Sequence, residues 1–365
     1  MSTSVNARIY ARSPYIVSIN VAGQVSGKVE IFLSNSIGNP PISPQYNLSK
    51  PILSSNLTEI TFDISPYCRE FISNSVPQPS LTNIQSLDNF EYCYFEVYAY
   101  YDDGVSGEQL DAFYYGVATN GYTSFEDGAN YDNTIAGIYA KSGTYYYYPD
   151  SNTIGNIGQV GIHKFNGASP VTSAQYVDFV EGVVTTINLS TITDNPEQFR
   201  LIPKVLNANY FGGNTLYLKN GATVLRTLVF KPIVECKYTP VKIDYIDKFG
   251  MWNFLWFFKA SNENISTTSK QYNIKQTSWN YDPIYGVSKI FNKTGRKTFT
   301  LNTGWMEEDS NFQIEELMLS ERVLIDGKPA ILKTDKTELF KHLNNKQFSY
   351  QMEFEVAYDL IQNVK

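Results

Sequence analysis

The closing stretch of the chain, Lys346–Val356, alternates apolar and polar side chains without a break. Its apolar members are Phe348, Tyr350, Met352, Phe354 and Val356. Successive side chains of a strand point to opposite faces, so a period of two places all of these on one face. The pattern predicts a strand with one buried side and one side in water, and therefore a sheet with a covering layer around it.

The remainder of the final third, residues 231–365, supplies candidates for that sheet and layer. Strands are predicted in Val234–Asp244, Met251–Phe258 and Thr298–Thr303, and a helix over Glu307–Ser320. Acidic residues crowd the start of this helix, where they suit the helix dipole. Two short strands are expected in Arg322–Ile325 and Ala330–Leu332, with a turn at Asp326-Gly327 between them. A last hairpin is expected to begin with Glu338–His342 and to turn at Asn344-Asn345 into the closing strand.

These elements predict an antiparallel sheet with one helix across it, the α+β layer arrangement. All four tryptophans of the chain lie in this third. Large aromatic side chains at such density are typical of a core or of a subunit interface. The core or interface candidates are Trp252, Trp256, Phe257, Trp305, Tyr350 and Phe354.

The first segment, residues 1–120, has the turn-punctuated pattern of a β-sandwich. Ile16–Asn20 and Val29–Leu33 are predicted to be partner strands, and Glu59–Ile64 is another strand. Ser65-Pro66 begins a short helix, because proline suits the first helical position. A long strand over Glu91–Tyr101 turns at Asp102-Asp103-Gly104 toward a second strand near Ala112–Val117.

The middle segment, residues 121–230, is also β-rich and is predicted to be a separate domain or an insertion. Strands are expected in Gly158–Phe165, Tyr176–Asn188, Gln198–Val205 and Thr215–Phe230. Asn220-Gly221 separates two apolar runs, which is a strong hairpin signal because both residues tolerate positive φ. Asp127–Asn133 lacks the spacing and terminal glutamate of an EF-hand, so it is interpreted as a polar loop.

Composition favours the same mainly β class and argues against several functions. Aromatic residues make up 15% of the chain and charged residues 18%, and 28 residues are tyrosines. Tyr and Phe suit pleated, half-buried surfaces. The net charge is −7 and no Lys/Arg block occurs, which argues against sequence-specific nucleic-acid binding. The longest apolar run, Phe249–Phe258, is too short to span a bilayer, and no secretory signal is recognised.

No catalytic, metal or cofactor site is predicted, and the protein is expected not to be an enzyme. The two histidines, His163 and His342, are far apart, and no nucleophile elbow, metalloprotease, phosphate-loop or dinucleotide motif occurs. The three cysteines are odd in number and have no paired spacing, so free thiols in a reducing compartment are expected. They are Cys68, Cys93 and Cys236.

The succession of segments in the final third resembles tail-associated structural proteins of tailed bacteriophages that infect Bacteroidota. The similar stretches are Pro240–Tyr245, Asp247–Trp252, Thr300–Trp305, Glu315–Val323, Pro329–Asp335 and Tyr350–Glu355, together with Ala11–Tyr15 at the start. The similarity covers the first 120 and the last 130 residues and leaves the middle unplaced.

This resemblance implies a virion protein of the baseplate, tail tip or fibre attachment, assembled in the cytoplasm of the host bacterium. It implies a tail-tube-like β domain in the final third, which forms a ring or another homo-oligomer, and an N-terminal sandwich that docks other tail proteins or fibres. The open alternative is a tail fibre or receptor-binding protein whose aromatic residues contact a host glycan. A polysaccharide hydrolase would need a carboxylate pair in a cleft, and no such pair stands out in the sequence.

Overall fold

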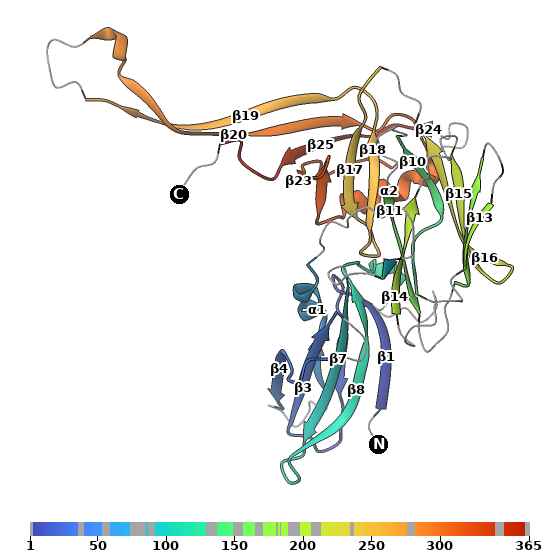
Figure 1. Ribbon diagram of the computed structural model, residues 1–365. Helices are drawn as coiled ribbons and strands as arrows, with labels where there is room; N and C mark the ends of the chain where they lie inside the picture. The colour runs from blue at the N-terminus through green and yellow to red at the C-terminus, as the bar shows by residue number, and fades with distance from the viewer. Residues whose placement is uncertain are drawn as a thin grey trace. The chain divides into compact units, whose positions relative to one another are not determined.

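The chain is mainly β in a computed structural model (Figure 1), as the composition predicts. The structure describes residues 3–35, 40–52, 59–73, 85–86, 92–128, 137–148, 156–164, 171–179, 182, 184–188, 198–205, 213–233, 237–275, 282–339 and 347–361. Its contacts divide the chain into two units. The first contains Met1–Pro232 and Ile246–Asn253, and the second contains Ile233–Tyr245 and Phe254–Lys365. The boundaries at residues 120 and 230 stay predictions.

The N-terminal segment forms a sandwich of two sheets and a short helix. Its elements are β1 (Thr3–Tyr10), β2 (Ile16–Ile19), β3 (Ser26–Ser34), β4 (Tyr46–Pro51), β5 (Ile60–Asp63), α1 (Ser65–Phe71), β6 (Gln85–Ser86), β7 (Tyr92–Asp102) and β8 (Glu108–Thr119). The larger sheet has the order β1-β8-β7-β3-β4, and β2 pairs with β5. One apolar core lies between the two sheets and includes Val17, Ile31, Phe62 and Phe95.

Local chemistry explains most of this sandwich. In β3 every second side chain is buried, as period two requires. Pro66 occupies the first turn of α1. The predicted pairing of Ile16–Asn20 with Val29–Leu33 is wrong, because β2 pairs with β5 while β3 pairs with β4 and β7. The turn between β2 and β3 therefore connects the two layers, and not two neighbours in one sheet.

The middle segment forms two further sheets. Its elements are η1 (Phe125–Asp127), β9 (Ile138–Tyr139), β10 (Gly143–Tyr147), β11 (Asn156–Lys164), β12 (Ser173–Asp178), β13 (Val184–Asn188), β14 (Gln198–Val205), β15 (Asn214–Asn220) and β16 (Thr223–Pro232). Their orders are β10-β16-β15-β12-β13 and β6-β14-β11-β9. The predicted hairpin is confirmed, but its turn is displaced by one residue: Asn220 pairs with Thr223, so Gly221 and Ala222 form the turn, and Gly221 has φ 58° while Asn220 has no positive φ. The single strand predicted for Tyr176–Asn188 divides into β12 and β13, which pair with each other.

The second unit is built on one seven-stranded sheet of order β18-β17-β22-β23-β25-β20-β19. Its elements are β17 (Val241–Ile246), β18 (Trp252–Phe257), β19 (Asn262–Asn273), η3 (Pro283–Tyr285), β20 (Ser288–Asn302), β21 (Met306–Glu307), η4 (Glu308–Ser310), α2 (Asn311–Met318), β22 (Val323–Ile325), β23 (Lys328–Leu332), β24 (Gln347–Phe348) and β25 (Gln351–Val356). The predicted helix is confirmed but begins later, because Glu308 and Asp309 form the η4 turn before it. The expected hairpin strand Glu338–His342 lies mostly outside the described residues, and no strand is assigned to Glu338 and Leu339.

The alternation of the closing stretch is confirmed, but the strand is interrupted. Phe348, Tyr350, Met352, Phe354 and Val356 are all buried. β25 pairs with β20, whereas β24 pairs with β21 in a separate two-stranded sheet. Between the two ladders, the Thr303 amide donates to the Tyr350 carbonyl at 2.9 Å. Gly304 and Trp305 then lie opposite the single residue Ser349, which is the geometry of a β-bulge. Gly304 has φ 74°, and a Cβ there would meet the Phe258 ring at 2.3 Å, so the kink requires glycine.

Candidate functional site

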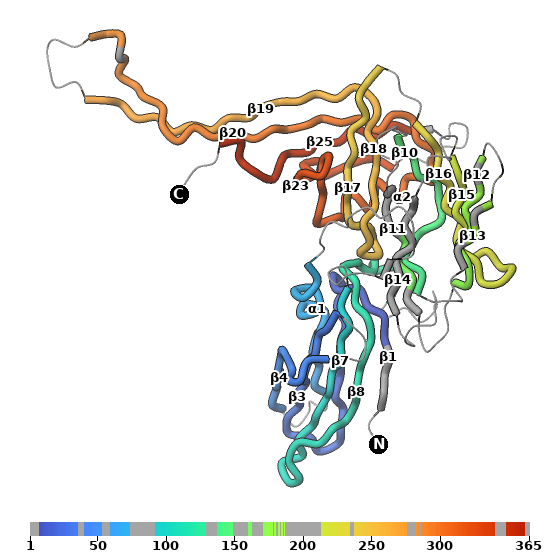
Figure 2. The backbone as a smooth tube through the Cα atoms, viewed as in Figure 1, coloured from blue at the N-terminus to red at the C-terminus, as the bar shows by residue number. Residues whose placement is uncertain are grey.

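The strands β19 and β20 continue far beyond the sheet that they belong to. β25 pairs with β20 only over Thr298–Asn302, so residues 288–297 of β20 pair with β19 alone. We call residues 262–275 and 282–297 the arm. Figures 1 and 2 show it leaving the other strands of the second unit as a long two-stranded ribbon. Ten residues of extended strand correspond to about 33 Å.

The arm has no buried face. Every side chain of β19 is exposed, and so are the first six of β20. Large apolar side chains are nevertheless frequent on it, and Ile284 at the tip turn is 81% exposed. The others are Ile265, Tyr272, Val287, Ile290 and Phe291. A two-stranded ribbon without a third layer is marginally stable in water, so this element needs a further contact to be held.

The base of the arm is secured by charged and backbone contacts within the second unit. Arg296 bonds Asp359 at 2.8 Å and Glu355 at 3.0 Å, and Lys297 pairs with Glu263 across the ribbon. The Leu360 amide donates to the Gly295 carbonyl at 2.8 Å. These contacts are largely exposed and contribute little to stability. They lie at the base, and we call residues 268–275 and 282–294 beyond it the distal arm.

One bulge shapes the distal arm. The pairing of β19 with β20 shifts between Thr268 and Lys270, and Asn292 on the opposite strand has φ 49°. Asparagine tolerates this left-handed conformation better than most residues. Beyond the bulge, Lys270 lies opposite Phe291 and Tyr272 opposite Lys289. Directly paired residues share a face of a ribbon, so two lysines and two aromatic rings gather on one side. The Tyr272 and Phe291 rings meet edge to face at 5.6 Å.

β19 is also the last strand of its sheet, so it presents a row of backbone donors and acceptors on its outer side. Such an edge is a template for pairing with another chain. A peptide strand that adds to an edge gains main-chain hydrogen bonds. The arm therefore combines an open edge with exposed apolar side chains. Sequence reasoning did not predict it, because a ribbon exposed on both faces leaves no period-two pattern.

The aromatic residues predicted for the core or an interface are placed as follows. Trp252, Phe257, Tyr350 and Phe354 are buried, and Trp256 is partly buried. Phe257 packs edge to face against Phe354 at 5.5 Å. These residues lie outside the arm.

Tyr350 lies beside the bulge in the closing ladder, and Trp305 is part of it. The Tyr350 hydroxyl donates to Asn311 Oδ1 at 2.6 Å, and its amide donates to Thr303 Oγ1 at 2.9 Å. Trp305 stands in the bulge and is 59% exposed, so it is available to a partner.

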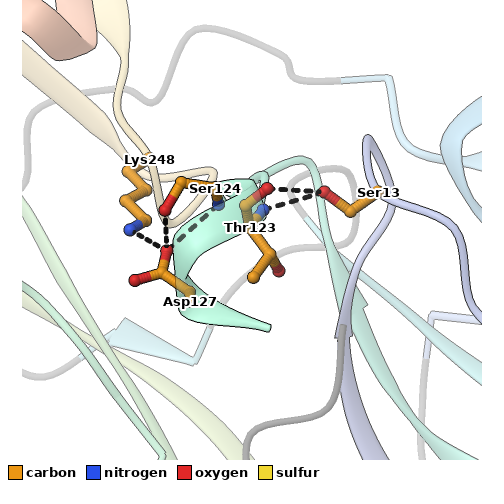
Figure 3. A network of polar contacts seen from close by, with 5 residues as sticks. All are labelled: Ser13, Thr123, Ser124, Asp127 and Lys248. Atoms are coloured by element: carbon orange, nitrogen blue, oxygen red, sulfur yellow. Dashed lines mark hydrogen bonds and ion pairs between the residues drawn. The ribbon is translucent and has the colours of Figure 1, made fainter. Parts of the chain in front are cut away.

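A polar network in the first unit fixes the turn that connects β17 to β18. Lys248 on this turn bonds the Asp127 carboxylate, which also accepts from the hydroxyl and the amide of Ser124 (Figure 3). Ser13 bonds Thr123 nearby, with the Thr123 amide donating to Ser13 Oγ at 2.8 Å. Hydrogen bonds from Lys248 and then Ser124 lower the pKa of Asp127 to about 2. The network gives Asp127 a structural role. Gly128 follows it as the C-cap of η1, and residues 129–133 of the predicted polar loop lie outside the described residues.

Apolar and backbone contacts also hold the turn between β17 and β18. The Thr119 hydroxyl donates to the Phe249 carbonyl at 2.8 Å, and the Tyr122 amide donates to the Lys248 carbonyl. Met251 is buried in a cluster with Tyr92, Tyr94, Val117 and Tyr139. The turn is thus packed against buried side chains, which explains why Met251, near the start of the apolar run Phe249–Phe258, is buried.

Possible metal ligands and one surface depression in the described part of the chain are as follows. No group of three or more His, Cys, Asp or Glu side chains there is arranged to hold a metal. A depression of about 540 Å³ is lined by Arg12, Asp63, Arg69 and Glu70 among others. Asp63 Oδ1, however, accepts from the Ser65 hydroxyl at 2.7 Å and from the Tyr15 amide, so it serves α1 and the neighbouring turn.

The cysteines, the helices and the comparison with known proteins bear on the remaining predictions. Cys68 and Cys93 are free and buried, whereas Cys236 lies outside the described residues. None of the helices described is of a length and hydropathy that would carry it through a bilayer. No protein-family model and no curated protein matches the chain.

Proposed function

We propose that the protein is a non-enzymatic structural component of a bacteriophage tail that assembles with copies of itself. Its place would be the baseplate, the tail tip or the attachment of a fibre, and its assembly would occur in the host cytoplasm. The tail assignment rests on the resemblance of the first and final thirds to tail-associated proteins. The assembly assignment rests on the arm.

The arm carries the proposal because the described residues of β19 and of the distal half of β20 are exposed. An exposed ribbon with six large apolar side chains and an open edge gains stability only from a further layer or a further strand. Copies of one protein that share such an edge can close into a ring, which removes the unpaired edge altogether. A purely solvent-facing ribbon would be expected to carry polar side chains in place of Ile265, Ile290 and Phe291.

The test compares the full chain with an arm-shortened variant. Residues 268–294 are replaced by Asn-Gly, which joins the paired residues Thr267 and Gly295 through a favoured two-residue turn. The base contacts of Arg296 and Lys297 remain in place. Light scattering over a range of concentrations gives the mass, and negative-stain images give the shape.

We expect the full chain to form closed rings or to shift toward them as concentration rises, and the shortened variant to remain monomeric with the same circular dichroism. A full chain that stays monomeric at high concentration would contradict self-assembly. An elongated trimer that binds host cells would favour the alternative of a glycan-binding fibre.

A further inference from the structure

The outward face of the larger N-terminal sheet is unusually aromatic. β3, β7 and β8 alternate between core residues and outward residues, and the outward series contains, beside Lys28 and Tyr100, a group of four aromatic rings and two carboxylates. We call this group the aromatic face; it consists of Glu30, Phe32, Glu96, Tyr98, Phe113 and Tyr115. The water-facing side of an antiparallel sheet is ordinarily polar. This sheet instead carries apolar rings on both sides.

The rings form a continuous series across three strands. Phe32 meets Tyr98 edge to face at 5.5 Å, and Tyr98 meets Phe113 at 4.7 Å. Phe113 then stacks on Tyr115 at 5.4 Å with an angle of 15° between the rings. Each of these side chains is half-buried because its neighbours shield it. The rings stand against one another, so they form a ridge and not a set of separate flat surfaces.

The aromatic face continues a surface that is already covered within the first unit. Along β7, Tyr94 points to the same side as Glu96 and Tyr98, because these residues are two apart. Tyr94 and Val117 are buried against Tyr139 and Met251. One end of this side is therefore an interface inside the molecule, and the aromatic face is its half-exposed continuation.

Glu96 gives the aromatic face its electrostatic character. Burial raises the pKa of its carboxyl group, while the Tyr98 hydroxyl bonds to it. The ion pairs of the described residues do not include Glu96, whereas Glu30 lies 3.0 Å from Lys28. Lys28 is itself shared with Glu108 at 2.9 Å. A partly desolvated carboxylate beside aromatic rings favours a partner that brings a cation and apolar surface together.

The arm offers that chemistry. Residues 262–297 contain six basic and two acidic residues, in a chain whose net charge is −7. The basic residues are Lys270, Lys275, Lys289, Lys293, Arg296 and Lys297. One side of the distal arm bears two cations and two rings, namely Lys270, Lys289, Tyr272 and Phe291. We call this side the arm face. The aromatic face likewise places carboxylates beside rings.

From this complementarity we infer that the arm face of one copy docks on the aromatic face of a second copy. The inference rests on the proposed self-assembly and names the surface that receives the arm. Lys270 or Lys289 bonds Glu96, and the Tyr272 and Phe291 rings pack against Tyr98 and Phe113. Charge complementarity sets the orientation, and burial of the rings supplies most of the affinity.

A charge exchange tests the contact. Lys289→Glu and Glu96→Lys are each expected to raise the concentration at which half the protein is assembled by about tenfold or more, because like charges then face each other. The double variant restores much of the loss, since the pair is reversed and not removed. Glu321→Lys, at an exposed position of the second unit, is the matched control and leaves the midpoint unchanged.

A second readout identifies the surfaces directly. Equal amounts of ¹⁵N-labelled and unlabelled protein are mixed, assembled and treated with a carbodiimide, which joins a lysine amine to a carboxylate. We expect cross-linked peptides that unite Lys270 or Lys289 with Glu96 or Glu30, half of them with one labelled and one unlabelled partner.

Three outcomes would overturn the inference. Assembly that depends on the arm but is unaffected by Glu96→Lys would show that the arm docks elsewhere, and the proposed function would stand. Cross-links that never mix the isotopes would place the contact inside one chain. A full chain that does not assemble at all would remove both the inference and the proposed function.

Discussion

The hairpin β7–β8 and the hairpin β19–β20 have the same secondary structure but different sources of stability. β7 and β8 lie inside a five-stranded sheet, and one side of each packs into the sandwich core. β19 and the distal half of β20 form a ribbon of two strands with no buried side. Backbone pairing is comparable in the two hairpins, so the difference lies in burial. A strand pair becomes an independent element only when a third strand or a second layer removes one of its faces from water.

The largest expected difference between the two hairpins concerns one phenylalanine in each. Phe95→Ala removes a ring that is 1% exposed in the sandwich core and should lower the free energy of unfolding by about 3–5 kcal/mol. Phe291→Ala removes an exposed ring and should lower the free energy of unfolding of the dilute protein by less than about 1 kcal/mol. Denaturant unfolding of both variants measures this, and equal losses would contradict the comparison.

Glycine replacement gives a second matched pair. A Cβ at Gly116 in β8 would lie 1.8 Å from the Ala7 carbonyl oxygen, so Gly116→Ala forces β1 away from β8. We expect a loss of about 3 kcal/mol in the free energy of unfolding. A Cβ at Gly295 in the arm lies 3.0 Å from the Ser266 carbonyl oxygen, and Gly295→Ala should cost less than about 1 kcal/mol. Thermal unfolding of the two variants would refute this pair if Gly295→Ala were the more damaging.

Asn292 tests whether the bulge shapes the arm locally. Its φ of 49° is permitted for glycine and costly for a β-branched residue, so Asn292→Val should destabilise the distal ribbon by about 1–2 kcal/mol and Asn292→Gly should be nearly neutral. Because the distal arm buries no part of a core, the change should appear in assembly and not in global unfolding. A Val variant that assembles like the parent would show that the bulge is dispensable.

The smallest expected effect is the pH dependence of the Asp127 network. Its folded pKa of about 2 lies below the ordinary value of 3.8, so its stabilising contribution is present above pH 4 and is lost as pH falls toward 2. The group is mostly exposed, which limits the contribution to less than about 1 kcal/mol. Asp127→Asn should therefore flatten the acid side of the stability curve slightly, with Glu126→Gln as the control. Identical curves for Asp127→Asn and the parent would show that the network does not contribute to stability.

The sequence predicts the parts of the fold in which a local pattern marks the element, such as a strand with one buried and one exposed face. The alternation of Lys346–Val356, the hairpin at Gly221 and the Ser65-Pro66 helix start all appear in the structure, because each reflects a local rule of geometry. The interruption of the closing strand was not predicted, since a bulge depends on the opposite strand. Its signal lies at Gly304-Trp305, a glycine beside the exposed tryptophan and across from Ser349.

The sequence does not predict the arm, nor the partner of β2. Ile265, Tyr272 and Ile290 have no period that points to a core, because the ribbon has no buried side. The strand β2 lies close to β3 along the chain, yet its partner is β5, more than forty residues away. Long-range pairing of this kind is decided by which faces meet in the core, and proximity in sequence favours the wrong neighbour.

Hydrogen exchange of the arm at two protein concentrations shows whether a second copy completes the arm. We expect that the amides of β19 and distal β20 exchange rapidly in the dilute protein and become protected on assembly, while those of β7 and β8 are protected at both concentrations. Strong protection of the arm in the dilute monomer, or no gain of protection in the assembled protein, would contradict the claim that the arm is completed by another copy.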